Sequence, residues 1–505
     1  MDEKNEPQSS RANSKCEGQL HEIAGTATSH NIAVVDNAIQ TIGFGKYQIR
    51  LFFTCGFGFF VDQMLAVSVG LVLPQVKKQW DVQYPSMITA ALYAGSLVGA
   101  IICGLAADLV GRRLLWQISL FVVTVFTMIA AASPSFTALA VFIGLQSIGA
   151  GGNIAIDLTV FVEWLPRSKG YILTALAMWF GVGNAVGGLL AWPLIDSFSC
   201  PAEATSSTCK SSANMGWRYQ YILVGGLCLV LALIRVFCMS MEESTKWLVT
   251  QGRFEDAIEE LGKVARMNKS EVTVSIQDFR PIQELPLNET RSQKARRQCS
   301  HIRGLFTTRK LGISTTGVSV LWMEIGIAYP IYTLYLPIYL ANNGADIGDG
   351  STFQTYRDYS ISSTVGIAGP VLSACLVDIK ILGRRRSMAL TALCAASFAG
   401  AFTSVRTEAG NIAFSSMINF WQNAFYGILY AYTPEVMPTA FRGTGCGLAV
   451  ACGRTASLSS PFIATFADLT SSVPLWVCVG LYVLIAAVAV TLPFEPKTFS
   501  EEDHI

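Results

Sequence analysis

Long apolar stretches alternate with short polar connections along most of this chain. Each stretch has about the 20 residues that an α-helix needs to cross the hydrocarbon core of a bilayer. We therefore predict two sets of six membrane-spanning helices. The first set covers residues 48–72, 87–107, 114–132, 136–160, 171–195 and 219–240. The second set covers residues 311–340, 358–378, 388–405, 411–432, 443–467 and 474–494.

Three polar segments flank or separate these two sets. Residues 1–47 are rich in Ser, Asn, Glu and Lys, and we predict a disordered cytoplasmic tail there. Residues 241–310 form a central cytoplasmic loop, in which apolar residues near Leu261 recur at helical spacing and predict an amphipathic helix. Residues 495–505 form a second short tail. The predicted domains are thus a tail, a bundle at 48–240, the loop, a bundle at 311–494 and a tail.

Basic residues give the expected orientation. Arg and Lys are concentrated in the central loop and in the connections that lie on its side of the membrane. Because cytoplasmic loops carry the excess of positive charge, we expect both termini and the central loop to be cytoplasmic. No organelle signal is recognised, so the plasma membrane is the expected location.

Composition supports an all-α membrane protein and excludes several other classes. The chain of 505 residues is 51% hydrophobic and 14% charged, which is too apolar for a soluble chain of this size. A net charge of +1 does not suggest nucleic acid as a partner. The 13 Cys and 4 His show no metal-binding spacing, and no nucleophile motif is present, so we expect neither an enzyme nor a bound cofactor or metal. Cys200 and Cys209 share one polar loop, where they are either bridged or free.

A short charged turn between two apolar stretches is the clearest pattern. Residues 104–113 read GLAADLVGRR, and residues 375–387, CLVDIKILGRRRS, repeat the same order. The glycine allows a sharp turn, and the aspartate can pair with an arginine or cap the next helix. The predicted residues of these turns are Asp108, Gly111, Arg112, Arg113, Asp378, Gly383, Arg384 and Arg385. A charged hairpin that merely fixes two helices is the alternative.

A second pair of loops is also repeated. VEWLPRSKG contains Glu163, and PEVMPTAFRG contains Glu435 and Arg442. Two loop types that each occur once per half indicate an internal duplication. Duplicated halves in a membrane chain suggest a transporter with its site between them.

Charged residues inside the predicted spans are the candidates for function, because burying a charge in a membrane is unfavourable. Asp62 lies mid-span in GFFVDQM and can pair with a buried cation or take up a proton. Glu324, beside Trp322, is a second candidate for proton or substrate binding. Arg454 can bind an anionic substrate or neutralise Asp62 or Glu324, and we favour the counter-ion role.

Polar and aromatic residues complete the predicted cavity. Asn153 follows two glycines within a span, and Trp322 and Tyr426 are aromatic residues at candidate positions, for which core packing is the alternative. We expect Asp157 to join the cluster around Glu163, and Arg235 only to extend toward the membrane surface.

The repeated loops resemble those of the major facilitator superfamily over about residues 46–498. FGKYQIRLFFTCGFGFFVDQM, WRYQYILVGG and LYAYTPEVMPTAFRGTGCGLAVACGR look most like the branch of synaptic-vesicle-protein-like and metabolite:proton symporters. MEESTKWLVTQGRFEDAIEEL resembles a sugar-porter segment, but Glu242 and Thr245 replace its two prolines. Asn153 stands where phosphate porters of similar pattern carry an acid.

The resemblance implies two six-helix bundles, a central cavity and alternating access. Asp108 with Arg112, and Asp378 with Arg384, would form a cytoplasmic gate network, and Asp62 matches an acid that proton-coupled relatives use. We predict a monomeric secondary transporter of a small organic solute, driven by protons in symport or efflux, with the lipid bilayer as its surroundings. A facilitative uniporter and a non-transporting sensor of the same fold are the alternatives.

Overall fold

The computed structural model describes residues 27–201, 204–239, 241–281, 303–342, 352–438, 442–466 and 473–496. Side chains at 105, 108–110, 332–342, 352 and 464–466 lie outside this description. The chain divides into two units. The bundle unit comprises Leu51–Val162, Gly170–Met241 and Arg297–Ile505, and the polar unit comprises Met1–Arg50, Glu163–Lys169 and Glu242–Arg296. Both predicted six-helix bundles fall in the bundle unit, apart from residues 48–50 and 163–169, which belong to the polar unit.

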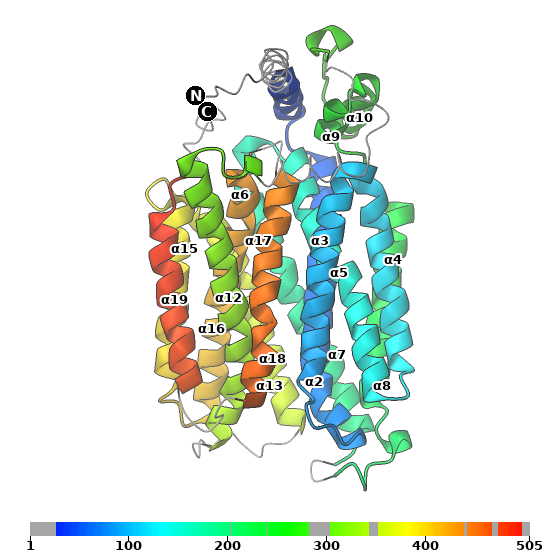
Figure 1. Ribbon diagram of the computed structural model, residues 1–505, viewed down its shortest axis with the longest axis vertical. Coiled ribbons are helices and arrows are strands. Elements are labelled where there is room, and N and C mark those ends of the chain that lie inside the picture. The colour runs from blue at the N-terminus through cyan, green and yellow to red at the C-terminus, as the bar shows by residue number, and fades with distance from the viewer. Residues whose placement is uncertain are drawn as a thin grey trace, which may run out of the picture. The chain divides into compact units, whose positions relative to one another are not determined.

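The helices of the first half follow the predicted spans closely (Figure 1). They are α2 (Lys46–Gln79), α3 (Met87–Val110), α4 (Arg112–Ala131), α5 (Phe136–Trp164), α6 (Tyr171–Leu176), α7 (Met178–Phe198) and α8 (Gly216–Leu233), which continues as the π-helix η3 (Ile234–Cys238). Because α6 and α7 meet at Ala177, they form one interrupted span. The first half therefore contains six spans, as the sequence predicts.

The second half repeats this pattern (Figure 1). Its helices are α12 (Arg309–Asn342), α13 (Thr352–Gly366), α14 (Ala368–Leu376), α15 (Gly383–Phe402), α16 (Glu408–Val436), α17 (Arg442–Ser457), α18 (Ser459–Phe466) and α19 (Val473–Thr491). Pairs α13–α14 and α17–α18 are each interrupted at one residue, so six spans result here too. Among the described residues, nine spans are long and apolar enough to cross a membrane. The predicted all-α membrane fold is confirmed.

The repeated turns occupy equivalent places in the two halves. Gly111 has φ 95° and immediately precedes α4, while Gly383 has φ 59° and begins α15. These backbone conformations favour glycine, which explains why both turns contain one. The duplication read from the sequence is thus a duplication of helix–turn–helix structure.

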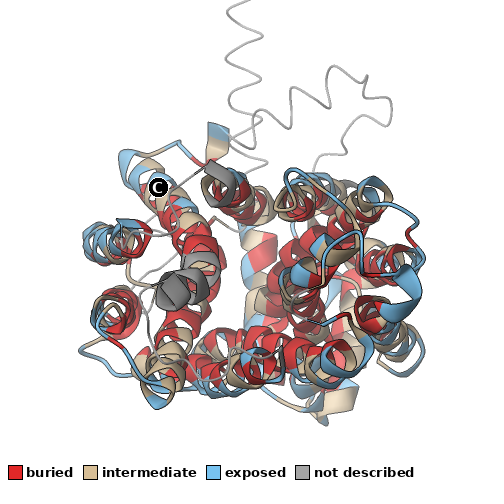
Figure 2. Cartoon of the chain, turned by 90° about the horizontal axis from the view of Figure 1, so that it is seen from below, coloured by how far each residue is buried: buried red, intermediate tan, exposed pale blue. Residues whose placement is uncertain are grey.

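Buried residues gather where the helices of the bundle unit face one another, and exposed residues cover their outer surfaces (Figure 2). The two halves meet through glycines. A β-carbon at Gly181 of α7 would lie 2.8 Å from the Ile367 Cα, and one at Gly188 would lie 2.9 Å from the Tyr359 ring. Small residues therefore let α7 approach the α13–α14 span closely.

Glycines also set the packing inside the first half, where we predict a measurable cost of substitution. A β-carbon at Gly95 of α3 would lie 2.0 Å from the Gly144 carbonyl oxygen of α5, so Gly95→Ala must force two backbones apart. We expect a loss of about 1–3 kcal/mol, measured as a lower unfolding temperature of the purified protein. The control is Gly226→Ala, because nothing lies within 4 Å of its β-carbon position. Equal stability of the two variants would contradict this reading.

In the polar unit, residues 27–42 form a helix, so the prediction of a disordered tail over 1–47 is wrong for this part. Ile32, Val35, Ile39 and Ile42 are buried, and their spacing makes one apolar helical stripe. The polar composition of the whole segment concealed that stripe. Residues 1–26 lie outside the described part of the chain.

Polar contacts hold this helix within its unit. Asp36 accepts a hydrogen bond from Arg167 of η1 (Arg167–Lys169) at 3.0 Å and also pairs with Lys246. Asn31 and Arg280 exchange two hydrogen bonds through the Asn31 side chain, at 2.8 and 2.7 Å. The helix thereby joins three separate segments of the polar unit.

The predicted amphipathic helix of the central loop is present as α10 (Phe254–Asn268), which follows α9 (Thr245–Thr250) and precedes η4 (Ile276–Asp278). Ala257, Leu261, Val264 and Ala265 are buried, as their spacing predicts. Residues 282–302 of the loop lie outside the described part of the chain.

One acid of α10 should make the polar unit sensitive to pH. Burial and the neighbouring Glu242 carboxyl raise the pKa of Glu260 to about 7, against the partial effect of Lys263. The folded polar unit therefore binds the proton of Glu260 more tightly than the unfolded chain does, so protonation of Glu260 stabilises the fold. This contribution to the free energy of unfolding is complete below about pH 4.5 and is lost as the pH rises through about 7. Glu260→Gln should remove that dependence, measured as hydrogen-exchange protection of α10 corrected for intrinsic rates. Glu259→Gln, whose wild-type side chain is 62% exposed, is the control and should leave it intact.

A disulfide joins Cys200 and Cys209 in the loop between α7 and α8, so the bridged alternative is the observed one.

Candidate functional site

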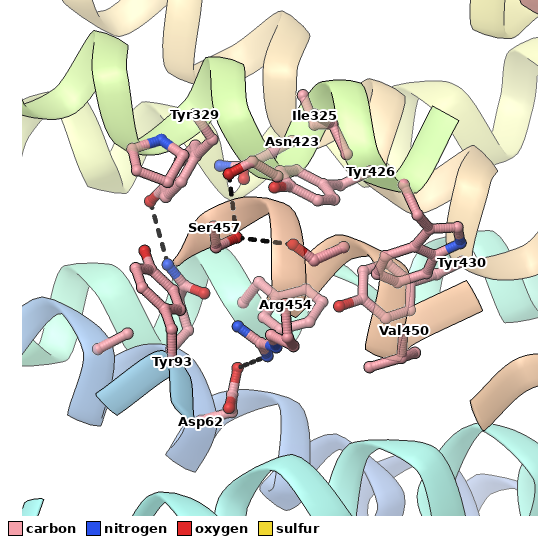
Figure 3. Close-up of a pocket in the computed structure, with 17 residues that line it drawn as sticks. Asp62, Tyr93, Ile325, Tyr329, Asn423, Tyr426, Tyr430, Val450, Arg454 and Ser457 are labelled. Carbon is pink, nitrogen blue, oxygen red and sulfur yellow. Dashed lines mark hydrogen bonds and ion pairs between the residues drawn. The ribbon is translucent and has the colours of Figure 1, made fainter. Parts of the chain in front are cut away.

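A cavity lies between the two halves of the bundle unit (Figure 3). It has about 660 Å³ of empty space, including the part open to solvent. Its walls come from α2, α3 and α7 of the first half and from α12, α16 and α17 of the second. The lining residues used below are Asp62, Gln63, Tyr93, Phe180, Trp322, Tyr329, Asn423, Tyr426, Tyr430, Arg454 and Ser457.

An ion pair crosses this cavity. Arg454 Nη2 of α17 donates to Asp62 Oδ2 of α2 at 2.9 Å, and the two side chains are 16% and 7% exposed. Two charges so far from water are tolerated because each neutralises the other. The counter-ion role favoured for Arg454 is therefore the one it has here, with Asp62 as its partner.

Aromatic rings form much of the remaining wall. Tyr430 contacts Trp322 edge-on at 4.6 Å between ring centroids and Phe180 at 5.0 Å. Tyr329 and Tyr426 contact one another at 5.9 Å. Trp322 is fixed further by its indole N–H, which donates to Thr433 Oγ1 at 2.9 Å. Rings from both halves thus surround the ion pair.

The uncharged polar groups of the wall already hold parts of the fold. Gln63 Nε2 donates to the Tyr329 hydroxyl at 3.0 Å, which links α2 to α12. Asn423 Nδ2 donates to the Gly366 carbonyl at 3.3 Å, and the Ser457 hydroxyl donates to the Gly326 carbonyl at 3.0 Å. The ion pair is the charged feature of the wall that a ligand can meet, beside the hydroxyl groups of Tyr93, Tyr426 and Tyr430.

Three of the four residues predicted for the substrate cavity line it, namely Trp322, Tyr426 and Arg454. Asn153 does not, and its prediction is corrected. Its side chain is buried at 1% exposure, where Oδ1 accepts from Ser119 at 2.9 Å and from Arg235 at 2.6 Å. A polar residue within a span is visible in the sequence, but the helix face that it occupies is not.

Sequence reasoning missed other lining residues, including Gln63, Tyr93, Phe180, Asn423 and Ser457. Gln63 follows Asp62 directly and could have been found from that position. Aromatic and small polar residues are common in every span, so the others carry no distinctive signal.

Asn153 belongs to a buried group that we call the polar cluster, formed by Thr54, Trp116, Asn153, Asp157 and Arg235. Arg235 and Asp157 pair at 3.1 Å, with both side chains 0% exposed. The guanidinium also lies 4.1 Å from the centroid of the Trp116 ring and donates to the Thr54 carbonyl at 2.7 Å. The expectations that Arg235 only extends toward the membrane surface and that Asp157 joins Glu163 are therefore wrong.

Glu324, the second predicted proton site, is buried at 6% exposure on α12 but does not line the cavity. Its Oε2 atom is buried and has no hydrogen-bond partner among the described residues. Its role in proton coupling stays a prediction.

Arg384 joins the two halves at the start of α15. It pairs with Glu435 of α16, donates from Nη1 to Thr174 Oγ1 of α6 at 2.6 Å, and donates from Nη2 to the Gly170 carbonyl at 3.0 Å. The carboxylate that pairs with Arg384 is that of Glu435 rather than that of Asp378, which is exposed. The predicted gate residues Arg384 and Glu435 therefore meet within the second half, and Arg384 crosses the boundary between the halves through its hydrogen bonds to Thr174 and Gly170.

The other predicted gate residues are placed as follows. Arg112 is buried and Arg113 is exposed, while the side chain of Asp108 lies outside the described residues. Arg442 Nε donates to the Pro434 carbonyl at 2.9 Å, and the Arg385 backbone N–H donates to Glu495 at 3.3 Å. Glu163 belongs to the polar unit, where it accepts from the Ser244 hydroxyl at 2.6 Å.

Removing the Arg384 contacts should favour opening at this end of the bundle unit. Hydrogen bonds to a charged group contribute about 1.5–3 kcal/mol, so Arg384→Ala should shift the closed–open equilibrium by at least about tenfold. The measurement is the labelling rate of a cysteine introduced in place of Gly170, because this change keeps the Thr174 hydroxyl and the carbonyl of residue 170 as partners of Arg384. Arg386→Ala, which removes an exposed arginine of the same turn, is the control. Unchanged labelling in Arg384→Ala would show that other contacts keep this end closed.

At the opposite end of the bundle unit, the Tyr356 hydroxyl of α13 donates to the Leu71 carbonyl of α2 at 2.6 Å. The two halves thus touch on both sides of a cavity that contains a buried ion pair.

Comparison with known proteins decides which family has this architecture. The family model described as Major Facilitator Superfamily matches residues 52–461. The chain belongs to the major facilitator superfamily.

Individual relatives agree with this assignment. The chain is 37% identical to MFS siderochrome iron transporter 1 of Ceriporiopsis subvermispora, over 93% of this chain and 91% of that protein. It is 26% identical to the synaptic vesicle 2-related protein of Xenopus laevis, over 92% and 81%. Among solved structures, the proton:xylose symporter XylE of E. coli superposes with a TM-score of 0.65 at 16% identity, covering 87% of this chain and 94% of that one.

The family and the likeness to synaptic-vesicle-related proteins are as the sequence indicates. This superfamily member is a multi-pass membrane protein of the transporter class rather than an enzyme.

Proposed function

We propose that this chain is a secondary active transporter that moves a small organic solute together with protons by alternating access. The observation that carries the proposal is the ion pair between Asp62 and Arg454, which lies inside the cavity and links the two halves. Transporters of this architecture bind their cargo between the repeated halves, and ionisable residues there are the usual sites of ion coupling.

Asp62 is the proposed proton site. Arginine keeps its positive charge at any pH that a cell meets, whereas a carboxylate can be protonated. Proton uptake by Asp62 would therefore weaken its bond to Arg454 and loosen one link between the halves. Glu324 is a second candidate, because one oxygen of its buried carboxyl has no hydrogen-bond partner within the part of the chain that the structure describes.

The cavity favours a small cargo. The relative with 37% identity is named for siderochrome iron, which raises a metal chelate as cargo. The volume of the cavity that water can enter is about 60 Å³, well below the range of about 300–1,000 Å³ for pockets that bury drug-sized ligands, and this favours a smaller organic solute.

We further propose that the chain acts as a monomer in the plasma membrane, with both termini in the cytoplasm and the proton gradient in place of a cofactor. The Cys200–Cys209 disulfide supports this orientation, because it lies in a loop expected outside the cell, where disulfides persist. The many basic residues of the central loop support a cytoplasmic position for that loop.

The test is untargeted metabolite profiling of cells and medium, with and without expression of the chain. A solute depleted from the medium identifies an importer, and one enriched there identifies an exporter. Accumulation of that solute against its gradient, driven by an imposed pH difference, then separates a proton-coupled transporter from a facilitative uniporter. A sensor of the same fold would change neither pool.

A further inference from the structure

We infer that the solute is a small planar aromatic carboxylate, which binds Arg454 in place of Asp62 while Asp62 takes up one proton. The inference rests on the proposed function, since it assigns the cargo of the same cavity. It is argued from the charges and the rings that the cavity presents.

The charge of the site selects an anion. In the empty site the Asp62 carboxylate and the Arg454 guanidinium cancel. Only the negative charge can be neutralised by a change of protonation, because the carboxylate can accept a proton whereas the guanidinium keeps its proton. A protonated Asp62 leaves Arg454 as an unpaired cation, and a carboxylate is the ligand that its planar fork of N–H groups fits best.

The binding site then has zero net charge both when it is empty and when it is loaded, the two states in which the transporter changes its open side. The empty site contains one negative and one positive charge. The loaded site contains neutral Asp62, cationic Arg454 and one carboxylate, and its net charge is again zero. A cationic solute would leave a net positive charge beside an arginine in a site away from water, which is strongly unfavourable.

The aromatic wall of the cavity indicates which uncharged part the solute carries beside its carboxylate. The cluster of Phe180, Trp322, Tyr426 and Tyr430 lines the same cavity as the ion pair. Figure 3 shows Tyr426 and Tyr430 in this wall. Aromatic pairs in stacked or edge-to-face arrangements contribute beyond their buried area, so a flat ring is favoured over a saturated one. A sugar would need many hydrogen-bonding partners, whereas the amides of Gln63 and Asn423 already donate to protein atoms.

The proton step is balanced without a further reactant. Asp62 releases its hydrogen bond from Arg454 and binds one proton from the solution, and the incoming carboxylate accepts the freed N–H groups. On release the solute leaves, the proton leaves on the same side, and the original pair forms again. One proton therefore accompanies one carboxylate.

Calorimetric titration of the purified full-length protein with benzoate tests the inference. Titrations near pH 7 in two buffers with different ionisation enthalpies report the protons bound with each benzoate. We expect about one proton per benzoate. Benzamide, with the same ring and no charge, and cyclohexanecarboxylate, with the same charge and no flat ring, should each bind at least about tenfold more weakly.

Variants assign the two roles. Arg454→Gln should weaken benzoate binding at least about tenfold, whereas Arg406→Gln, which removes an exposed arginine, should not change it. Asp62→Asn should still bind benzoate but without taking up a proton. If Arg454→Gln does not fold, Arg454→Lys keeps the charge, loses the two-pronged geometry and should bind with intermediate affinity.

Several results would overturn the inference. They are equal binding of benzoate and benzamide, tighter binding of benzyltrimethylammonium than of benzoate, binding of benzoate without a proton in the wild-type protein, and no binding of benzoate at millimolar concentration. None of these requires that transport be absent, because proton-driven flux of another solute would leave the proposed function intact. Conversely, if benzoate binds together with one proton but no solute is transported, the proposed transport function is rejected and the inferred binding of an aromatic carboxylate stands.

Discussion

Asp62→Asn should abolish proton-driven accumulation of the solute identified by profiling. Asparagine cannot carry the proton, and it leaves the Arg454 charge without a partner in the empty site. An unpaired buried charge is unfavourable by several kcal/mol, and each 1.36 kcal/mol in a barrier is a factor of ten, so net uptake should fall at least about a hundredfold. Exchange of internal for external solute should persist, because the loaded site does not need the Asp62 charge. The measurement is uptake into proteoliposomes with an imposed pH difference.

The control for this variant is Asp196→Asn, which changes an exposed aspartate near the end of α7 in the same way. It should accumulate solute as the wild-type protein does. Unchanged pH dependence of uptake in Asp62→Asn would remove Asp62 from the coupling mechanism and turn attention to Glu324.

Arg235→Met should have the largest effect on stability. It leaves the carboxylate of Asp157 fully buried without its ion-pair partner, and breaking a buried pair from one side destabilises by about 3–5 kcal/mol. The measurement is thermal unfolding of the purified protein. The double variant Arg235→Met with Asp157→Leu should recover much of the loss, since neither charge then remains to be buried.

Arg357→Met is the matched control, because Arg357 is 31% exposed and pairs with Asp358 and Glu408 near the surface. Such a pair contributes at most about 1 kcal/mol. If the double variant were no more stable than Arg235→Met alone, packing around Trp116 rather than the unpaired charge would explain the loss.

The spans, the duplicated turns and the charged candidates could all be predicted from the sequence, because length, repetition and a charge in an apolar stretch are local signals. Asp62 and Arg454 stand out for that reason. Which charges meet is a property of the fold. Arg454 could equally have neutralised Glu324, and Asp157 was expected near Glu163 but pairs with Arg235, because sequence position does not reveal which helix faces meet.

The helix at 27–42 and the placement of Asn153 were missed for different reasons. Short apolar stripes such as Ile32, Val35 and Ile39 are hidden in a polar segment when composition is averaged. Asn153 looks like a cavity residue because it follows two glycines, yet those glycines serve close helix packing. A β-carbon at Gly151 would lie 2.2 Å from the Ser96 carbonyl oxygen.

The polar cluster links several helices of the first half, so that they move together as one rigid unit. Arg235 contacts groups on α2, α4 and α5 at once, so these helices cannot slide past one another without stranding a charge. In the second half, Trp322 is tied to α16 and Ser457 to α12. The interface between the two halves is easier to rearrange, because it consists of close contacts at glycines and a few hydrogen bonds. Motion should therefore be a rocking of two stiff bodies about the ion pair, with little change inside either one.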